Sequence, residues 1–195
     1  FSIESRECKG LSKPLAVGII VASSVMFFRV LFEVAVLNPD LFWGLFITLG
    51  VMGSLGISMA IYLYFKKKKR VNNVGELEVK SPFSLVPALQ FAALFLFVMF
   101  VTKLLTLLVG NSGIYIISFI SGITDVDAIT ITLSRLALEG SISNAAAQMG
   151  IMVAAFANTF FKGAIAYALG SRDLFKLIIF VFGVMLFVGG LILVF

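Results

Sequence analysis

The segment GIYIISFISGITDVDAITITLSRLA (residues 113–137) has the length of a membrane span but carries two carboxylates, Asp125 and Asp127, near its middle. A helix of about 20 apolar residues crosses the hydrocarbon core of a bilayer. A charged side chain at the centre of that core costs about 2.5–3.5 kcal/mol or more, so such residues normally face a bundle interior and pair with one another. The rest of the chain therefore has to supply partners for these two acids.

The composition of the whole chain is that of an integral membrane protein. Its 195 residues are 61% hydrophobic and 13% charged, whereas soluble domains are about 45–50% apolar and about 25% charged. The sequence has no histidine and a single cysteine, Cys8, which excludes His-based zinc sites, Ser–His–Asp triads and internal disulfides. An aspartyl dyad draws its acids from separate elements, unlike Asp125 and Asp127, so we do not expect an enzyme.

We predict an all-α fold, a polytopic membrane protein with six transmembrane helices in one domain over residues 1–195. Six apolar stretches reach the length of a span: residues 15–37, 41–65, 83–109, 113–137, 145–169 and 174–195. They form three tandem helical hairpins, at residues 15–65, 83–137 and 145–195.

The loop at residues 66–82 opens with KKKKR and determines the expected orientation. Because short basic loops stay in the cytoplasm, we expect this loop and both termini there, and the three tight hairpin turns outside. The basic run also suits contact with anionic lipid at the membrane surface far better than a nucleic-acid site. We therefore expect the lipid bilayer, and no nucleic acid, as a partner.

The three hairpins share a pattern that indicates an internal repeat. The segments FFRVLFEVAVLNPDLFWGLFITLG (27–50), FVTKLLTLLVGNSGIYIISFISG (100–122) and FFKGAIAYALGSRDLFKLIIFVFG (160–183) each hold a basic residue, a turn and a final glycine. A serine precedes each basic residue at an expected helix N-cap, Ser143 in the third hairpin. We interpret the pattern as hairpins of one orientation, related by an axis along the membrane normal. Chance similarity between apolar sequences is the alternative.

Six ionisable residues fall well inside the predicted spans, and their formal charges sum to zero. They are Arg29, Glu33, Lys103, Asp125, Asp127 and Lys162. Arg29 and Glu33 are four residues apart and can pair on one helix face, as a gate or a structural pair. Small residues at every fourth position of 146–166 place Asn158 and Lys162 at one close helix interface. The same stripe of small residues would also suit a homo-oligomer.

The two-residue spacing of Asp125 and Asp127 raises the question of a helix break. On a regular helix the two side chains point about 200° apart. Both can reach one polar centre only if the helix is unwound, and Gly122, Thr124 and Thr130 favour a break because the threonine hydroxyls can bond freed backbone groups. If the helix stays regular, the two acids serve different interfaces.

The charges predict a binding or conduction site for a small inorganic ion, in a transporter or channel. The expected ion-binding residues are Asp125, Asp127, Asn158 and Thr124, with Asp125 and Asp127 as ligands of any bound metal cation and Lys103, Lys162, Arg29 and Glu33 as charge partners or gate. The opposite hypothesis is that the basic residues line a path for an anion. Structural ion pairs that only fix helix register are another. The alternative from a different class is a membrane-embedded regulatory or assembly module that acts through helix–helix contacts.

Several segments together resemble the uncharacterised C-terminal membrane domain of prokaryotic MgtC/SapB-type membrane proteins. They are RVLFEVAVLNP (29–39), KSPFSLVPALQFA (80–92), GITDVDAIT (122–130) followed by SRLA (134–137), and ANTFFKG (157–163). The resemblance implies a location in a prokaryotic inner membrane and an upstream MgtC-like domain, which would explain a chain that starts without Met. It implies magnesium-linked physiology only by association and no settled activity.

Overall fold

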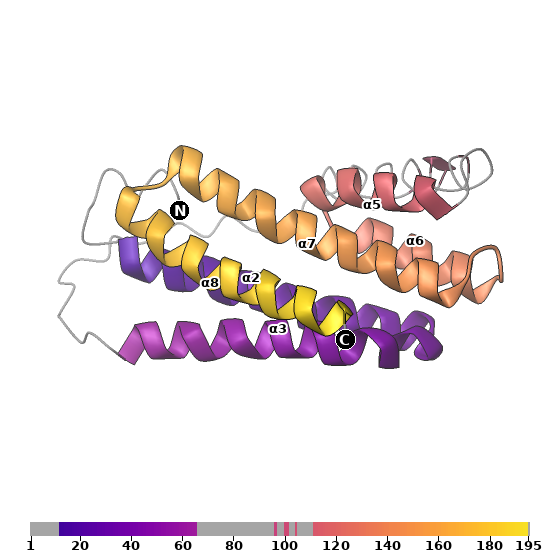
Figure 1. Cartoon of the computed structure of the whole chain (residues 1–195), viewed down its shortest axis with the longest axis horizontal. Coiled ribbons are helices and arrows are strands. Elements are labelled where there is room, and N and C mark those ends of the chain that lie inside the picture. The colour runs from indigo at the N-terminus through magenta and orange to yellow at the C-terminus, as the bar shows by residue number, and fades with distance from the viewer. Residues whose placement is uncertain (1–11, 66–95, 97–99, 102–103, 105–110, 195) are drawn as a thin grey trace, which may run out of the picture.

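The computed structural model describes residues 12–65, 96, 100–101, 104 and 111–194, in which every regular element is a helix (Figure 1). The helices are α2 (Ser12–Leu37), α3 (Pro39–Phe65), α5 (Asn111–Thr124), α6 (Asp127–Leu138), α7 (Asn144–Leu169) and α8 (Arg172–Val194). The all-α class is confirmed. The expected loop 66–82, most of the expected helix 83–109 and Lys103 lie outside the described residues.

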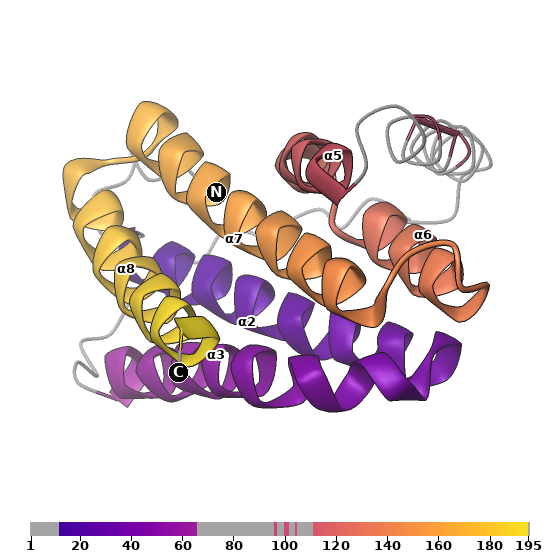
Figure 2. The same ribbon diagram turned by 45° about the vertical axis from the view of Figure 1, so that its right-hand side comes forward.

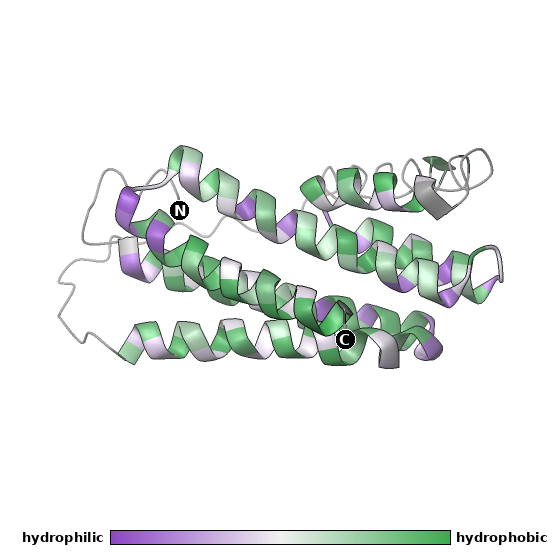
Figure 3. Ribbon diagram, viewed as in Figure 1, coloured by the Kyte–Doolittle hydropathy of each residue, from purple (hydrophilic) through white to green (hydrophobic). Residues whose placement is uncertain are grey.

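Four of these helices are long and apolar enough to cross a membrane. They are residues Lys13–Leu37, Pro39–Phe65, Asn144–Leu169 and Arg172–Leu193. Hydrophobic residues dominate all four (Figure 3), and large apolar side chains such as Phe32, Trp43 and Phe187 are exposed. Because an apolar surface of this extent is unfavourable in water but suits lipid, the fold is that of a membrane protein.

Two tight turns close the hairpins α2–α3 and α7–α8, as the sequence predicts. Pro39 is the first residue of α3, where its missing N–H costs no helix hydrogen bond. The Ser171 hydroxyl accepts a hydrogen bond from the Leu174 amide (3.3 Å) at the start of α8. The expected N-cap Ser143 is confirmed, because its hydroxyl accepts from the Ala146 amide at 3.2 Å.

The two hairpins point in opposite directions along the bundle. Gly44 of α3 lies against Gln148 of α7, and eight residues further along α3, Met52 meets Gly189 of α8 beside Phe156 of α7. The contacts of α3 and α7 thus occur in the same order, so these helices run parallel, and α2 runs parallel to α8 (Figure 1).

The single orientation expected from the internal repeat is therefore wrong for these two hairpins. Their α2–α3 and α7–α8 turns lie at opposite ends of the bundle. In a bilayer this order would place the start of α2 and the end of α8 on opposite sides, in contrast to the expectation of two cytoplasmic termini. The physical reason is that a basic residue, a turn and a glycine are compatible with either direction of a hairpin.

The expected fourth span, residues 113–137, is two helices rather than one. Helix α5 has 14 residues and helix α6 has 12, so at 1.5 Å per residue they are only about 21 and 18 Å long. Each is shorter than the hydrocarbon core, which is about 30 Å thick. The prediction of six full spans is therefore not confirmed at this segment.

The chain also reverses direction between α5 and α6, as their contacts with α7 show; Figure 2 views α5 nearly along its axis, next to α7. Ile114 of α5 lies against Gly150 of α7, and Gly122 lies against Ala154, so α5 and α7 run parallel. Leu133 of α6 also lies against Gly150. Because only a short turn, residues 139–143, joins α6 to α7, these two helices are antiparallel. Helices α5 and α6 thus form a short hairpin packed on α7, with its tip inside the molecule.

Candidate functional site

The tip of the α5–α6 hairpin carries both acids that the sequence singles out. Helix α5 ends at Thr124 and α6 begins at Asp127, so of the two alternatives left by the sequence, a broken or a regular helix, the broken one is present. The Asp125 amide still donates to the Ser121 carbonyl (2.8 Å), and the Ser121 hydroxyl donates to the Asp125 carbonyl (3.3 Å). Val126 provides no side-chain cap for α6. Asp127 therefore lies in the first turn of α6, where free amides and the helix dipole favour a carboxylate.

Arg29 of α2 is the centre of the charged group at this tip. Its Nη2 atom lies 2.5 Å from each Asp127 carboxylate oxygen and 3.9 Å from Asp125 Oδ1. Its Nε atom lies 3.9 Å from Glu33 Oε1, so the expected pair on α2 is present but long. The sequence indicated each of these residues but not that Asp127 is the nearest partner of Arg29.

The exposure of these side chains differs within the group. The Arg29 side chain is 52% exposed, whereas the Asp127 side chain is 14% exposed and that of Glu33 is 19% exposed. Asp125 lies between these values. The acids are therefore largely enclosed by the helices, while the guanidinium has room to move among its three carboxylate neighbours.

Asn158 holds the end of α5 against α7. Its amide nitrogen donates to the Gly122 carbonyl (2.8 Å), which belongs to the last turn of α5. A carbonyl in this position lacks a partner in its own helix, so Asn158 acts as a C-terminal cap from a neighbouring helix. The side chain is only 6% exposed, and its Oδ1 atom has no hydrogen-bond partner among the described residues. Its position supports the break rather than direct contact with the acids.

The close approach of α5 and α7 depends on small residues. A Cβ atom placed on Gly122 would lie 2.8 Å from the Ala154 Cα atom, nearer than real Cβ atoms come. Gly150, one turn earlier on α7, lies against Ser118 of α5 and Leu133 of α6. The small-residue stripe of α7 thus packs inside the molecule, which removes it as an argument for a homo-oligomer.

Lys162 lies near the acids without an ion pair. Its Nζ atom is 3.4 Å from Met26 Sδ, a weak contact, and it is within range of Coulombic interaction with Asp125 and Asp127. No carboxylate in the described part of the chain comes within 4.0 Å of it. Lys162 therefore contributes positive charge at a distance. Thr124 is exposed at the end of α5, directly before the acids.

The described charged group contains three carboxylates and two basic side chains. If all five are ionised, the net charge is −1, in contrast to the zero sum that includes Lys103. No set of three or more acidic or cysteine side chains among the described residues is arranged to hold a metal ion. Ca²⁺ takes six to eight oxygen ligands, whereas Mg²⁺ keeps several of its water molecules and is usually held by one or two carboxylates. Asp125 and Asp127 as ligands of a bound metal cation therefore stay a prediction.

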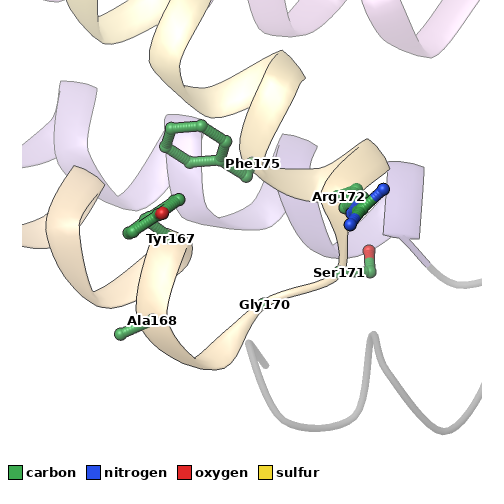
Figure 4. Close-up of a pocket in the computed structure, with 6 residues that line it drawn as sticks. All are labelled: Tyr167, Ala168, Gly170, Ser171, Arg172 and Phe175. Atoms are coloured by element: carbon green, nitrogen blue, oxygen red, sulfur yellow. The ribbon is translucent and has the colours of Figure 1, made fainter.

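A separate shallow pocket lies at the α7–α8 turn (Figure 4). It is lined by Tyr167, Ala168, Gly170, Ser171, Arg172 and Phe175. The rings of Tyr167 and Phe175 lie 4.9 Å apart at one side of it. The pocket contains no acidic side chain and none of the residues expected from sequence, so we do not regard it as the ion site.

The fold and the charged group define a helical membrane protein with a polar centre at a helix break. The chain matches, over residues 1–170, the family described as "Domain of unknown function (DUF4010)", and it belongs to that family. An "Uncharacterized protein" of Aquifex aeolicus (strain VF5) is 37% identical over 174 residues, which cover 89% of this chain and 76% of the relative. No solved structure matches the chain significantly. The expected relation to MgtC/SapB-type proteins stays a prediction.

Proposed function

We propose that this protein binds a small inorganic cation at the tip of the α5–α6 hairpin and moves it across the membrane. The observation that carries the proposal is the α5–α6 hairpin, whose tip lies inside the molecule and carries two carboxylates. Non-helical backbone at membrane depth is tolerated where it is buried in protein or lines a water-filled cavity. Broken helices at the bilayer midplane are where many transporters bind their ions.

The depth of the break supports this interpretation. Asp127 is the first of the 12 residues of α6, and this helix is about 18 Å long. Half of the hydrocarbon core is about 15 Å, so the acids would lie close to the middle of the bilayer. Ionisable residues at that depth are costly and usually mark a substrate or ion pathway.

The balance of charge favours a cation over an anion. Three carboxylates face two basic side chains, and Arg29 is nearest to Asp127. One added positive charge would neutralise the group. Because the group has one negative charge in excess, a proton or a monovalent metal ion balances it better than a divalent ion.

Arg29 offers a simple gating step. In the conformation described, it occupies both oxygens of Asp127, but Glu33 lies within 3.9 Å on the same helix. A cation bound between Asp125 and Asp127 would compete with the guanidinium, which would then pair with Glu33. Release of the cation would return Arg29 to Asp127. Such an exchange keeps the Arg29 guanidinium paired with a carboxylate throughout, which matters because an unpaired charge in the membrane is expensive.

A flux assay in liposomes tests the proposal. Purified protein is reconstituted and the uptake of Li⁺, Na⁺, K⁺, NH₄⁺, Mg²⁺, Cl⁻ and protons is measured against protein-free vesicles. We expect uptake of one monovalent cation or of protons at a rate at least tenfold above the protein-free background. Flux of Cl⁻ alone, or flux of no ion, would reject the proposal.

The alternative is a membrane-embedded regulatory or assembly module. The observation that favours it is the half-exposed Arg29, a charged side chain that a partner helix could contact. Photo-crosslinking from Phe32, which lies on α2 and is also exposed, would then capture one partner in native membranes. A homo-oligomer and an upstream MgtC-like domain are possible partners of this kind and remain predictions.

We further propose that the protein lies in a prokaryotic inner membrane with the Phe65 end of α3 on the cytoplasmic side. The support is the sequence KKKKR that directly follows Phe65, because short basic segments remain in the cytoplasm. The turn at Asn38 would then lie outside and the turn at Gly170 inside. This assignment replaces the expected common orientation of the hairpins.

A further inference from the structure

The interface between α2 and α6 contains three buried polar atoms without a hydrogen-bond partner in the described part of the chain. They are Glu33 Oε2, Thr130 Oγ1 and Ser134 Oγ. The residues Thr130 and Ser134 are fully buried. Leaving such a group unpaired costs the full penalty of removing it from water, so buried polar atoms in native proteins nearly always meet a protein group or an ordered water molecule.

These atoms follow one line rather than being scattered. Asp127, Thr130 and Ser134 are spaced i, i+3 and i+7, which places them on one face of α6. Both ends of this segment meet the first hairpin: Asp127 pairs with Arg29 of α2, and the backbone carbonyl of Ser134 accepts from the Asn38 side chain in the α2–α3 turn at 3.4 Å. Polar groups therefore run along the interface from the helix break toward the α2–α3 turn.

Three other buried hydroxyls in the protein behave differently. The hydroxyls of Ser24, Thr132 and Thr159 each donate to the carbonyl four residues earlier in their own helix, at 2.8 to 2.9 Å. Thr132 lies on α6 between Thr130 and Ser134 and is equally buried. One further buried hydroxyl without a partner among the described residues, Ser118 Oγ, lies on α5 against Gly150. Within α6, the unpaired hydroxyls are those of Thr130 and Ser134, whereas Thr132 bonds its own helix.

We propose that the α2–α6 interface is a hydrated path by which a monovalent cation reaches Asp127 from the Asn38 end of the molecule. This inference rests on the proposed function. Ordered water needs two to four polar partners, and the side chains of Glu33, Thr130 and Ser134 supply them in sequence. The path covers the seven residues from Asp127 to Ser134, about 10 Å at 1.5 Å per residue. The Asn38 end of the path and the Phe65 end of α3 lie at opposite ends of the bundle. Because the Phe65 end is the proposed cytoplasmic side, the path opens to the extracytoplasmic side.

Cysteine labelling tests the path directly. The natural cysteine is first removed as Cys8→Ser, and Thr130→Cys, Ser134→Cys and the matched control Thr132→Cys are then made singly in that background. A membrane-impermeant methanethiosulfonate reagent is added to sealed vesicles of known orientation. We expect Thr130→Cys and Ser134→Cys to react at least tenfold faster than Thr132→Cys, and only from the Asn38 side. Reactivity equal to that of Thr132→Cys, or reaction only from the Phe65 side, would overturn the path.

A second variant does not depend on the thiol. Thr130→Val keeps the shape of the side chain and removes its hydroxyl. If that hydroxyl is hydrated, the thermal unfolding midpoint of the purified protein falls; a midpoint that stays the same or rises contradicts the path, because a dry unpaired hydroxyl is better replaced by a methyl group.

The labelling result is separate from the flux result. If Thr130→Cys and Ser134→Cys are labelled fast but the protein moves no ion, the proposal of a hydrated path stands and the proposal of transport is rejected. Flux together with unreactive cysteines would keep transport and reject this path.

Discussion

At the scale of single residues, Arg29 connects helices that are far apart in the sequence. Its guanidinium meets Asp127, 98 residues away, and has Asp125 and Glu33 as further neighbours. Its Nη2 atom lies beside both Asp127 oxygens while its Nε atom faces Glu33, so one planar guanidinium serves carboxylates of two helices from separate nitrogens. A single ammonium group on a flexible stem does not reproduce this arrangement. Arg29 is thus suited to hold the α6 terminus and to exchange between carboxylates.

This role predicts the effect of a conservative substitution. Arg29→Lys keeps the charge but replaces several nitrogens by one, which cannot face Asp127 and Glu33 at the same time. We therefore expect a loss of about 1 kcal/mol of stability for this half-exposed side chain. That corresponds to a fall of about 2–4 °C in the thermal unfolding midpoint for a chain of this size. The control Arg135→Lys changes an exposed arginine of the same helix bundle and should shift the midpoint by less than half as much. Equal shifts for both variants would contradict the role given to Arg29.

The sequence predicted the members of the charged group better than their pairing. Intramembrane charges are recognisable because lipid excludes them, so Arg29, Glu33, Asp125, Asp127 and Lys162 all stood out. The Arg29–Asp127 contact depends on how α6 lies beside α2, and no local pattern encodes that. The unpaired hydroxyls of α6 were also missed, because serine and threonine in an apolar helix usually bond their own backbone.

At the scale of elements, the hairpin of α5 and α6 is the unusual feature. The sequence indicated a break, since acids two residues apart cannot face one centre from a regular helix. It did not indicate that the chain turns back, because hydropathy measures the number of apolar residues and not their direction. The reversal is held by Asn158, which caps α5, and by the contact of Gly122 with Ala154.

The glycine contact gives a test of this element. Gly122→Ala adds a methyl group against the backbone of Ala154, where neither side can move easily, so we expect a loss of about 1–3 kcal/mol in stability. In the matched control Gly50→Ala, the new Cβ meets nothing within 4 Å, and alanine should stabilise the helix by about 0.5–1 kcal/mol. Thermal unfolding in detergent compares the two. A Gly122→Ala protein as stable as the wild type would show that α5 does not pack on α7 in this way.

At the scale of the whole molecule, the two long hairpins are inverted with respect to each other. The sequence predicted the hairpins α2–α3 and α7–α8 correctly, because long apolar runs and tight turns are local features. Their relative direction follows from packing of α3 on α7 and α8, which the apparent repeat did not reveal. The charged group lies between α2 and α6, which run parallel to each other, as the contacts Arg29–Asp127 and Asn38–Ser134 show.

The inverted order makes a clear prediction about sidedness. In the Cys8→Ser background, Asp40→Cys at the start of α3 and Arg172→Cys at the start of α8 should react with an impermeant reagent from opposite sides of sealed vesicles. Both positions are exposed, so access to the thiol is not limiting. Labelling of both cysteines from the same side would contradict the inverted order and support hairpins of one orientation, as the internal repeat predicts.

The most direct test of the central claim is ion flux in variants of the two acids. Asp125→Asn and Asp127→Asn keep the size of each side chain and remove its charge, whereas Asp40→Asn makes the same change at an exposed acid outside the group. In reconstituted liposomes we expect the cation flux of Asp125→Asn and Asp127→Asn to fall at least tenfold, while that of Asp40→Asn stays within twofold of the wild type. Flux at the wild-type rate in both Asp125→Asn and Asp127→Asn would contradict a cation site at the α5–α6 tip.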